Sequence, residues 1–287
     1  MGREIRREQN YVERVAGAYG VATLDDGFYR SAAPATKESV FFILGSGASV
    51  ESLSEIDFAV IADNFSIGIN AWALHSFVPN AYAFEPVPSR ESDHFQTMAM
   101  LDRPEVGAKS PFVLFLRPRS AIEGEQVSQI PQGLRAGTHF YGRVTPFTRE
   151  TANLAGEIDS LMDYFEQHHA PSVMLDSGAS IARMTTLGVR LGYTTVVYVG
   201  VDLNNSEYFW ERNPEYLARL GLESFDSGQK TSVHETMSPL NRPFVVTDMI
   251  RGFSDSAEIG ARVSFFSGSV DSALNNFLPL YPWPTRS

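Results

Sequence analysis

The chain has 287 residues, of which 43% are hydrophobic and 12% aromatic, so it can bury one large core or one core with a small added lobe. Its formal net charge of -11 argues against a nucleic-acid partner, because phosphate neutralisation requires a clustered basic surface. Without cysteine, the chain can form neither a disulfide nor a thiolate metal site.

The first 37 residues mix charged residues with glycine and alanine and end in SAAPATKES. This composition predicts an N-terminal arm or short helix before a single catalytic domain over residues 38–287. Asp25 and Asp26 lie in this arm, in LDDG, and are interpreted as a turn rather than a metal-binding motif. The N-terminus is charged and no stretch approaches the roughly 20 apolar residues of a membrane span, so we expect a cytoplasmic protein with at most peripheral contact at the inner membrane face.

The segment VFFILG, which begins at Val40, is a continuous apolar run of the kind that forms a buried parallel strand. Further strands are predicted at FSIGIN, AYAFEPV and PFVLFLRP, with ARVSFFSGS as the last one. Strands alternating with helical segments predict an α/β fold with a Rossmann-like, mostly parallel sheet and flanking helices.

Residues 118–152 are rich in Gly, Pro, Arg and Thr without a clear period, and residues 204–241 are polar and aromatic with turn signals. Either segment is predicted to form a loop or a small lid subdomain, because long loops inside compact domains usually have a function. Between them, SVMLDSGASIARMTTLGVRLGYTTVVYVGVDL predicts a complete βαβ unit whose helix ends near Gly192.

The turn GSGAS, residues 45–49, directly follows the first strand, where backbone amides can bind a phosphate or ribose oxygen. It lacks the complete GxGxxG and GK[ST] fingerprints, so a purely structural tight turn remains open. Asn70, the segment Asp176–Gly178 and Asp202 also follow predicted strands. Because ligands of open α/β sheets lie beyond the carboxyl ends of strands, these ends predict a shared pocket.

His234 lies in the loop SGQKTSVHETMSP, away from any apolar periodicity. Imidazole titrates near neutral pH, which suits a general base, although an exposed loop histidine remains an alternative. The adjacent His168 and His169 point in different directions on a helix end and make a poor metal pair.

Taken in order, ILGSGASV, GIN, the helix-strand block with LGY and GVD, SEYFW and VHETMSP resemble the landmarks of the bacterial sialyltransferases of glycosyltransferase family 42. The resemblance covers about residues 40–283. It implies a GT-A variant fold with a small lid, a CMP-sugar donor, inversion at the anomeric carbon and no metal or other cofactor. It also implies a surface-glycan acceptor, as in lipopolysaccharide or capsule biosynthesis, and self-association into a homo-oligomer.

The resemblance also implies roles for individual residues. On the nucleotide side, the residues that would line the phosphate, ribose and base are Gly45, Ser46, Gly47, Ser49, Asn70, Gly200 and Asp202. On the sugar side, Asp176, Ser177 and Gly178 would hold the donor. Tyr208 would donate its hydroxyl to the departing phosphate, and His234 would remove the proton from the acceptor hydroxyl.

Three positions depart from the family pattern: Ser46 and Glu85 each stand in place of an asparagine, and Asn204 in place of a tyrosine. They leave the donor sugar open among sialic, legionaminic, pseudaminic and Kdo-type acids, with Arg117, Arg119 and Arg143 as candidates for its carboxylate. Two other functions also remain open: a pterin pyrophosphokinase that uses ATP and a metal, and a catalytically silent nucleotide-binding scaffold of a polysaccharide assembly complex.

Overall fold

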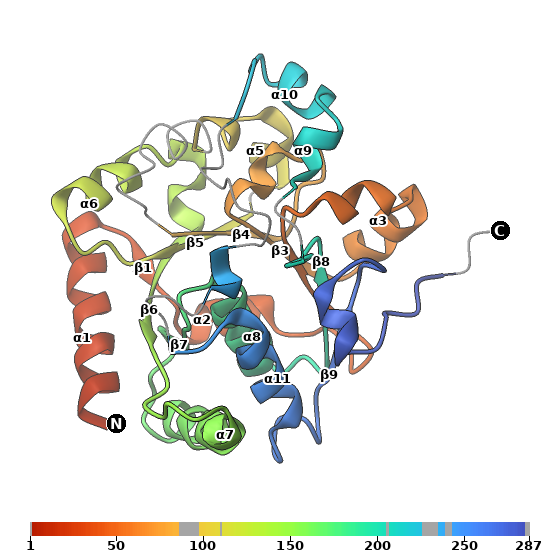
Figure 1. The fold of residues 1–287 in the computed structure, drawn as a ribbon. Coiled ribbons are helices and arrows are strands. Elements are labelled where there is room, and N and C mark those ends of the chain that lie inside the picture. Colours follow the sequence, from red (N-terminus) through yellow and green to blue (C-terminus); the bar gives the residue numbers. More distant parts are fainter. Residues whose placement is uncertain are drawn as a thin grey trace.

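The computed structural model describes residues 2–85, 98–109, 111–204, 207–225, 235–238 and 243–284. Within these ranges the chain forms a 9-stranded sheet in which all paired strands are parallel (Figure 1). The strands are β1 (Ala22–Thr23), β2 (Phe41–Leu44), β3 (Phe65–Ile69), β4 (Ala81–Phe84), β5 (Phe112–Leu116), β6 (Thr138–Val144), β7 (Val173–Leu175), β8 (Thr195–Val199) and β9 (Ser264–Ser267).

Across the sheet the strand order is β1-β6-β5-β4-β3-β2-β8-β9. Strand β7 also pairs with β6, through residues 142–144, beyond the stretch that pairs with β1. The predicted strands in VFFILG, FSIGIN, AYAFEPV and PFVLFLRP are confirmed as β2, β3, β4 and β5. Apart from Ser66 in β3 they are apolar, because both faces of a parallel sheet are covered. The predicted α/β class with flanking helices is therefore confirmed.

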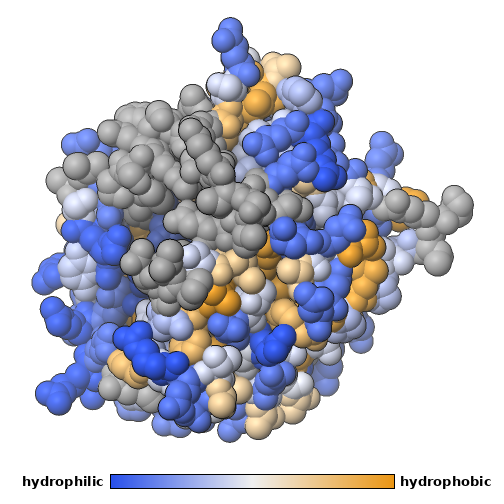
Figure 2. Space-filling model, viewed as in Figure 1, coloured by the Kyte–Doolittle hydropathy of each residue, from blue (hydrophilic) through white to orange (hydrophobic). Residues whose placement is uncertain are grey.

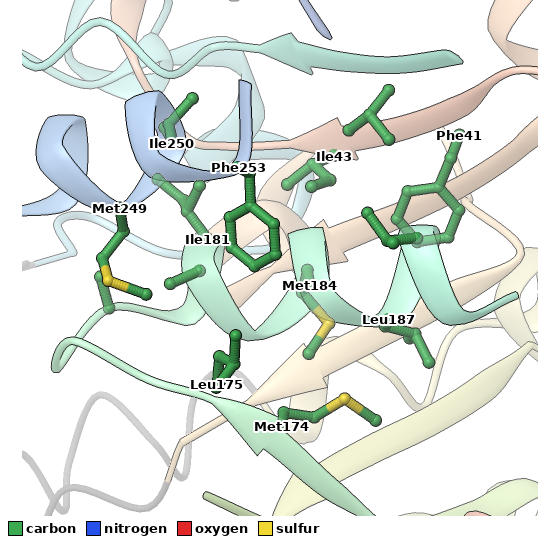
Figure 3. Packing of buried hydrophobic residues seen from close by; sticks show 14 of the residues in the cluster. Phe41, Ile43, Met174, Leu175, Ile181, Met184, Leu187, Met249, Ile250 and Phe253 are labelled. Carbon is green, nitrogen blue, oxygen red and sulfur yellow. The ribbon is translucent and has the colours of Figure 1, made fainter. Parts of the chain in front are cut away.

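Two hydrophobic layers cover the sheet. One face packs against α2 (Asp26–Ala32), α7 (Thr151–Gln167), α8 (Ser180–Arg190) and α11 (Val246–Asp255). Figure 3 shows this layer, in which Ile181 and Met184 of α8 lie between β2 and α11. The helix α8 has ten buried residues in a row, Ser180 to Val189, so it is the central support of this face.

The opposite face packs against shorter elements, whose buried side chains form a second cluster. They are α3 (Glu55–Ala62), α5 (Pro104–Lys109), α6 (Ala121–Ser128), α9 (Phe209–Arg212), α10 (Glu215–Arg219) and the 3₁₀ helix η2 (Asn70–Leu74). Other 3₁₀ helices are η1 (Ala48–Ser52), η4 (Gln132–Gly137), η5 (Glu235–Met237) and η6 (Ala273–Asn276). In the view of Figure 2 the described surface is mostly hydrophilic, as expected when the apolar residues are gathered in two such layers.

The N-terminal segment differs from the arm predicted for residues 1–37. It forms α1 (Gly2–Tyr19), β1 and α2, and β1 extends the sheet by pairing with β6. Ile5, Val12 and Ala16 are buried along one face of α1. Their spacing gives a narrow apolar stripe that the many charged residues on the other faces obscure in the sequence.

Residues 118–152, the first lid candidate, contain regular elements of the domain. This segment contains α6, η4 and β6, and β6 pairs with β1, β5 and β7. Its sequence THFYGRV mixes polar and apolar residues, so it lacks the uninterrupted apolar run that marks the other strands. The described part of the second lid candidate, residues 204–241, includes α9 and α10.

The βαβ unit predicted around DSGAS is confirmed as β7, α8 and β8. The helix ends at Arg190, and Gly192 follows with a φ of 89°. None of the described helices combines the length and apolar character required to cross a membrane.

Candidate functional site

The strand order reverses between β2 and β8. From β2 the chain adds β3, β4, β5 and β6 on one side, whereas β8 and β9 lie on the other side. In open parallel sheets such a reversal leaves a crevice beyond the carboxyl ends of the two adjacent strands, where ligands bind. A ligand site is therefore expected at the turns that follow β2 and β8.

These two turns are packed directly against each other. The amide of Gly45 donates to the carbonyl of Val199 at 2.7 Å, and that of Gly47 donates to the carbonyl of Gly200 at 2.8 Å. A Cβ on Gly200, whose φ is 63°, would lie 2.3 Å from the carbonyl oxygen of Gly45. Only glycines allow this approach, so the turn residues are dictated by the packing of β2 on β8.

A serine and aspartate network extends the contact to β9. Asp202 accepts the amide of Ser49 at 3.0 Å and also its hydroxyl. The Ser49 hydroxyl is 2.8 Å from that of Ser269, which in turn accepts the amide of Gly200 at 3.2 Å. Burial raises the pKa of Asp202, although the hydrogen bonds from Ser49 oppose that rise. The network fixes the ends of three neighbouring strands.

This packing changes the role of the GSGAS amides. Besides Gly45, Gly47 and Ser49, Ala48 also donates its amide within the chain, to the carbonyl of Glu207 at 3.1 Å. In this structure these four amides are therefore engaged by the protein and do not form a phosphate cradle. The half-exposed tip at Ser46 is the part of the turn that faces outward.

Residues 207–210, the described part of SEYFW, lie alongside the tip of the same turn. Gly47 and Tyr208 form an antiparallel bridge, and the amide of Phe209 donates to the carbonyl of Ser46 at 3.2 Å. The ring of Tyr208 stacks on Trp210 with centroids 4.5 Å apart. The structure therefore brings together Tyr208 and Ser46, which are far apart in the sequence.

Two asparagines stand near this crevice. Asn70 is exposed at the end of β3 with a φ of 51°, a left-handed conformation that asparagine tolerates better than most residues. Asn204 is exposed beyond β8, and its side chain donates to the carbonyl of Asp271 at 2.5 Å. Asn70 is thus placed between the β2 turn and the charged groups at the end of β4.

Four charged side chains form an ion-pair quartet beyond β4, β6 and β7. Arg183 donates to Asp176 at 2.5 Å, to Glu85 at 2.6 Å and to the hydroxyl of Ser180 at 2.9 Å. Arg143 lies 3.1 Å from both carboxylates. Arg183 is fully buried, whereas Glu85 and Arg143 keep 23% of their side-chain surface exposed. The two arginines and two carboxylates of the quartet carry no net charge together, so each charged side chain is neutralised by the others.

A polar atom without a partner lies next to this quartet. Among the described residues, the hydroxyl of Ser177 is buried and has no hydrogen-bond partner, whereas the buried hydroxyl of Tyr141 lies within reach of Arg183. Burial raises the pKa of Tyr141 to about 12. Gly178 follows with a φ of 80°. Unpaired buried polar groups are uncommon in proteins, so the Ser177 hydroxyl is available to a ligand at this strand end.

The three arginines predicted as carboxylate candidates differ in their partners. Arg117 forms a two-point ion pair with Glu8 of α1, at 2.8 and 2.7 Å. Arg119 lies 3.5 Å from Glu123, and half of its side chain is exposed. Arg143 alone belongs to the quartet, so it is the arginine of the three that lies with the predicted donor residues.

Sequence reasoning missed two residues of this edge. Ser269 follows β9 in SGS, and its signal is a Gly-Ser turn like the one after β2. Arg183 lies on α8, seven residues after Asp176. Its signal is a lone arginine on an otherwise apolar and small-residue helix face. Glu8, also missed, gives no signal because its partner is 109 residues away.

The other candidates are placed as follows. His234 lies outside the described residues. His168 caps the end of α7, and His169 has a φ of 44°. Asp25 is the N-cap of α2, where it accepts the amide of Phe28 at 2.9 Å, so LDDG is a helix start rather than a simple turn. Over the described ranges, no group of three or more His, Asp or Glu side chains could hold a metal ion.

A groove of about 660 Å³ lies elsewhere, where β1 ends and β7 begins. Its lining mixes both charges, with Asp25, Arg30, Glu166 and Arg190 among its residues. It is lined by α1, α2 and the end of α7 rather than by the strand ends of the β2–β8 crevice. The groove therefore does not mark the predicted site.

Comparisons with known proteins give structural similarity only. No family model matches the sequence, and no curated protein matches it. The monofunctional α-2,3-sialyltransferase Cst-I from Campylobacter jejuni matches with a TM-score of 0.46 and 13% identity, over 88% of this chain and 84% of its own. A tyrosine-to-phenylalanine variant of the sialyltransferase Cst-II in complex with CMP matches with a TM-score of 0.45 and 12% identity, over 86% and 87%. At these values the likeness defines neither family nor activity.

Proposed function

We propose that this protein is an inverting glycosyltransferase that moves a sialic-acid-like sugar from its CMP ester to a surface-glycan acceptor. One observation carries the proposal: three sequence landmarks, the turns at Gly47 and Gly200 and the segment at Tyr208, meet at the β2–β8 crevice. Their order in the sequence suggested a CMP-sugar site, and the fold gives them a common place where ligands of such sheets bind.

The chemistry requires hydrogen-bond donors at the departing phosphate. A CMP-linked keto sugar departs through an oxocarbenium-like transition state, so negative charge grows on the phosphate as the bond breaks. A fixed donor at such a position contributes about 3 to 4 kcal/mol. We assign this role to the hydroxyl of Tyr208, with Ser46 and Asn70 contacting the nucleotide. Because the leaving group is a monophosphate, no divalent ion is required.

The sugar side of the site is assigned to the strand ends beyond β4 and β7. Ser177 and Gly178 would hold the donor sugar, and Arg143 of the quartet would face its carboxylate. His234 would take the proton from the acceptor hydroxyl, a contribution of typically about 100-fold to 10,000-fold. The exact nonulosonic or Kdo-type acid, the self-association and the peripheral membrane contact remain predictions of the sequence.

A thermal-shift panel tests the nucleotide. CMP, CDP, UDP, GDP and ATP are compared with and without magnesium, and we expect CMP to raise the melting temperature without the metal. Stabilisation by ATP only with magnesium would contradict the proposal and favour a pyrophosphokinase. Stabilisation by UDP or GDP alone would contradict a CMP-linked donor.

A tyrosine pair tests the leaving-group donor. Tyr208→Phe should lower the rate of CMP-sugar turnover by about 100-fold or more, since one phosphate donor is lost. Tyr19→Phe, at a tyrosine that is 42% exposed on α1, is the matched control and should leave turnover unchanged. Equal rates for the two variants would remove Tyr208 from the mechanism.

A histidine variant tests the base separately. His234→Ala should abolish transfer and leave CMP binding, measured by calorimetry, nearly intact. Retained transfer would exclude His234 as the base.

A silent nucleotide-binding subunit is the second candidate. The engaged amides of the GSGAS turn and the paired carboxylates of the quartet favour it, because both satisfy the strand ends without a ligand. CMP binding without any slow hydrolysis of CMP-sugars would support this candidate over the transferase.

A further inference from the structure

A second polar cluster lies on the other side of η2, outside the crevice. Arg103, just before α5, donates from Nη1 to the carbonyl of His75 at 3.2 Å. Arg219, the last residue of α10, donates from Nη2 to the carbonyl of Leu74 at 3.1 Å. Since these two carbonyls belong to consecutive residues, the two guanidinium groups lie close together.

Arg103 is buried with most of its donors unused. Its side chain is only 9% exposed, and among the described residues its Nε and Nη2 have no hydrogen-bond partner. The nearest carboxylate, that of Glu105, is 3.5 Å from Nη1 and is half exposed. An arginine that is buried with free N–H groups is costly unless another acceptor fills the site.

The two positive charges act on each other. The pKa of Arg219 is lowered, first by burial and then by the charge of Arg103. Arg219 itself is largely at the surface, so the cluster opens to solvent at its α10 end. In a chain with a net charge of -11, two adjacent arginines form a local concentration of positive charge, and Glu105 at the rim is the carboxylate that pairs with Arg103.

The other groups around the arginines are neutral donors. The hydroxyl of Tyr82 on β4 is buried and lies within hydrogen-bonding reach of the Arg103 side chain. His75 accepts the amide of Phe77 at Nδ1 and lies 3.0 Å from the hydroxyl of Tyr216 at Nε2. Burial lowers the pKa of His75 to about 3, so this ring adds no positive charge.

We propose that Arg103, Arg219 and Tyr82 form a binding site for a phosphate group, separate from the β2–β8 crevice. Guanidinium forks match the spacing of phosphate oxygens, and a phosphate dianion balances both arginines at once. A carboxylate would balance only one of them. The phosphate belongs either to a small soluble phosphomonoester or to a lipid headgroup.

The acidic neighbours limit where the ligand can sit. Glu105 lies on the Arg103 side, and Glu51 accepts the side chain of Asn213 at 3.2 Å near Tyr216. A bound phosphate would therefore be placed between the two guanidinium groups and the Tyr82 hydroxyl, away from Glu51. None of these residues has a role in the proposed glycosyl transfer, so the phosphate site and the proposed function can be tested independently.

Titration with inorganic phosphate tests the site directly. In calorimetry we expect saturable binding to the full chain, weakened at least tenfold in Arg103→Gln and in Arg219→Gln. Arg212→Gln is the matched control, because Arg212 is an exposed arginine of the adjacent α9 that pairs with Glu207. Phosphate binding that is unchanged in Arg103→Gln and Arg219→Gln would overturn the proposal.

A stability measurement separates a ligand site from a structural arginine. In phosphate-free buffer, Arg103→Gln should melt at or above the temperature of the wild type, because it removes one of two neighbouring positive charges. Phosphate should then raise the melting temperature of the wild type and of Arg212→Gln but not that of Arg103→Gln. A large loss of stability without phosphate would show a structural role and contradict the site. Should Arg103→Gln fail to fold, the exposed Arg219→Gln gives the same comparison.

Vesicle sedimentation distinguishes the two sources of phosphate. Binding to vesicles that contain phosphatidic acid, but not to phosphatidylcholine alone, and its loss in Arg219→Gln, would identify a lipid headgroup. Binding of inorganic phosphate without such sedimentation would identify a soluble phosphomonoester. Failure of both would overturn the site, while the CMP panel would still decide the proposed function.

Discussion

The carboxyl edge of the sheet has two halves that are built in different ways. Beyond β2, β8 and β9, the turns are joined by backbone amides and small side chains, with Asp202 as the one carboxylate of the network. Beyond β4, β6 and β7, the ends are joined by the side chains of Glu85, Arg143, Asp176 and Arg183. The first half depends on the absence of side chains, and the second depends on the balance of four charges.

This difference predicts different sensitivities. A substitution in the glycine half adds atoms where there is no space, so its cost is steric. A substitution in the charged half leaves a buried partner without its counter-charge, so its cost is electrostatic. Substitutions in each half therefore test whether the two halves are stabilised by different interactions.

The largest effect is expected at Arg183. Arg183→Met leaves Asp176 and Glu85 with only Arg143 as a counter-charge, and should lower the free energy of unfolding by about 3 to 5 kcal/mol. Urea denaturation measures this loss. Arg212→Met, at an exposed ion pair with Glu207, is the control and should change stability little. Equal effects of the two substitutions would show that the quartet does not hold this half together.

A glycine pair tests the other half. Gly200→Ala combines a φ of 63° with a Cβ placed 2.3 Å from the Gly45 carbonyl, and should cost about 3 kcal/mol or more. Gly192 also has a positive φ, 89°, but a Cβ there meets nothing within 4 Å. Gly192→Ala therefore isolates the backbone strain, and should cost clearly less in the same denaturation series. Equal losses would mean that the β2 and β8 turns are not closely packed.

The two halves also differ in how far the sequence predicted them. The glycine half was predictable because a tight strand end requires Gly, which GSGAS and VGVD both contain directly after an apolar strand. The structure places these two turns in contact across the reversal of strand order, while the direction of their amides could not be predicted from the sequence. An amide direction depends on the partner strand, which lies 155 residues away in the case of Gly45 and Gly200.

The charged half was predicted only in part. Asp176 was identified because it follows a strand, and Glu85 through the family resemblance, but their pairing with Arg183 depends on how α8 packs on the sheet. The same limit applies to β6, whose mixed polar and apolar sequence becomes a strand only through its neighbours. Local patterns predicted the apolar strands well, and they failed where tertiary contacts decide the structure.

A smaller effect is expected at Ser269, which links β9 to the other two strand ends. Ser269→Ala removes the hydroxyl that interacts with Ser49 and accepts the amide of Gly200, and should cost about 1 kcal/mol. Ser31→Ala, where an exposed hydroxyl bonds within its own helix, is the control and should cost less. Equal losses in urea denaturation would contradict a role for Ser269 in joining the three strands.

The smallest effect concerns the pH dependence that Asp202 contributes to stability. Burial raises the pKa of this carboxyl above its usual 3.8, so the folded state holds the proton more tightly than the unfolded state. Its contribution is then fully present below the unfolded pKa and is lost as the pH rises through the folded pKa. The stability of the wild type minus that of Asp202→Asn should therefore fall with rising pH, as measured by urea denaturation from about pH 3.5 to about pH 7.

Asp63→Asn, at an exposed aspartate, is the control for this series and should show no comparable fall. The direction in which the Asp202 stability difference changes with pH tests the packing of the glycine half. Burial raises the pKa of Asp202, whereas the hydrogen bonds from Ser49 lower it. Hydrogen bonds from the Ser49 amide and hydroxyl stabilise the charged carboxylate, whereas exclusion of water destabilises it. A difference that rises with pH would show that these hydrogen bonds outweigh burial, and thus that the crevice admits more water than the close packing of its turns implies.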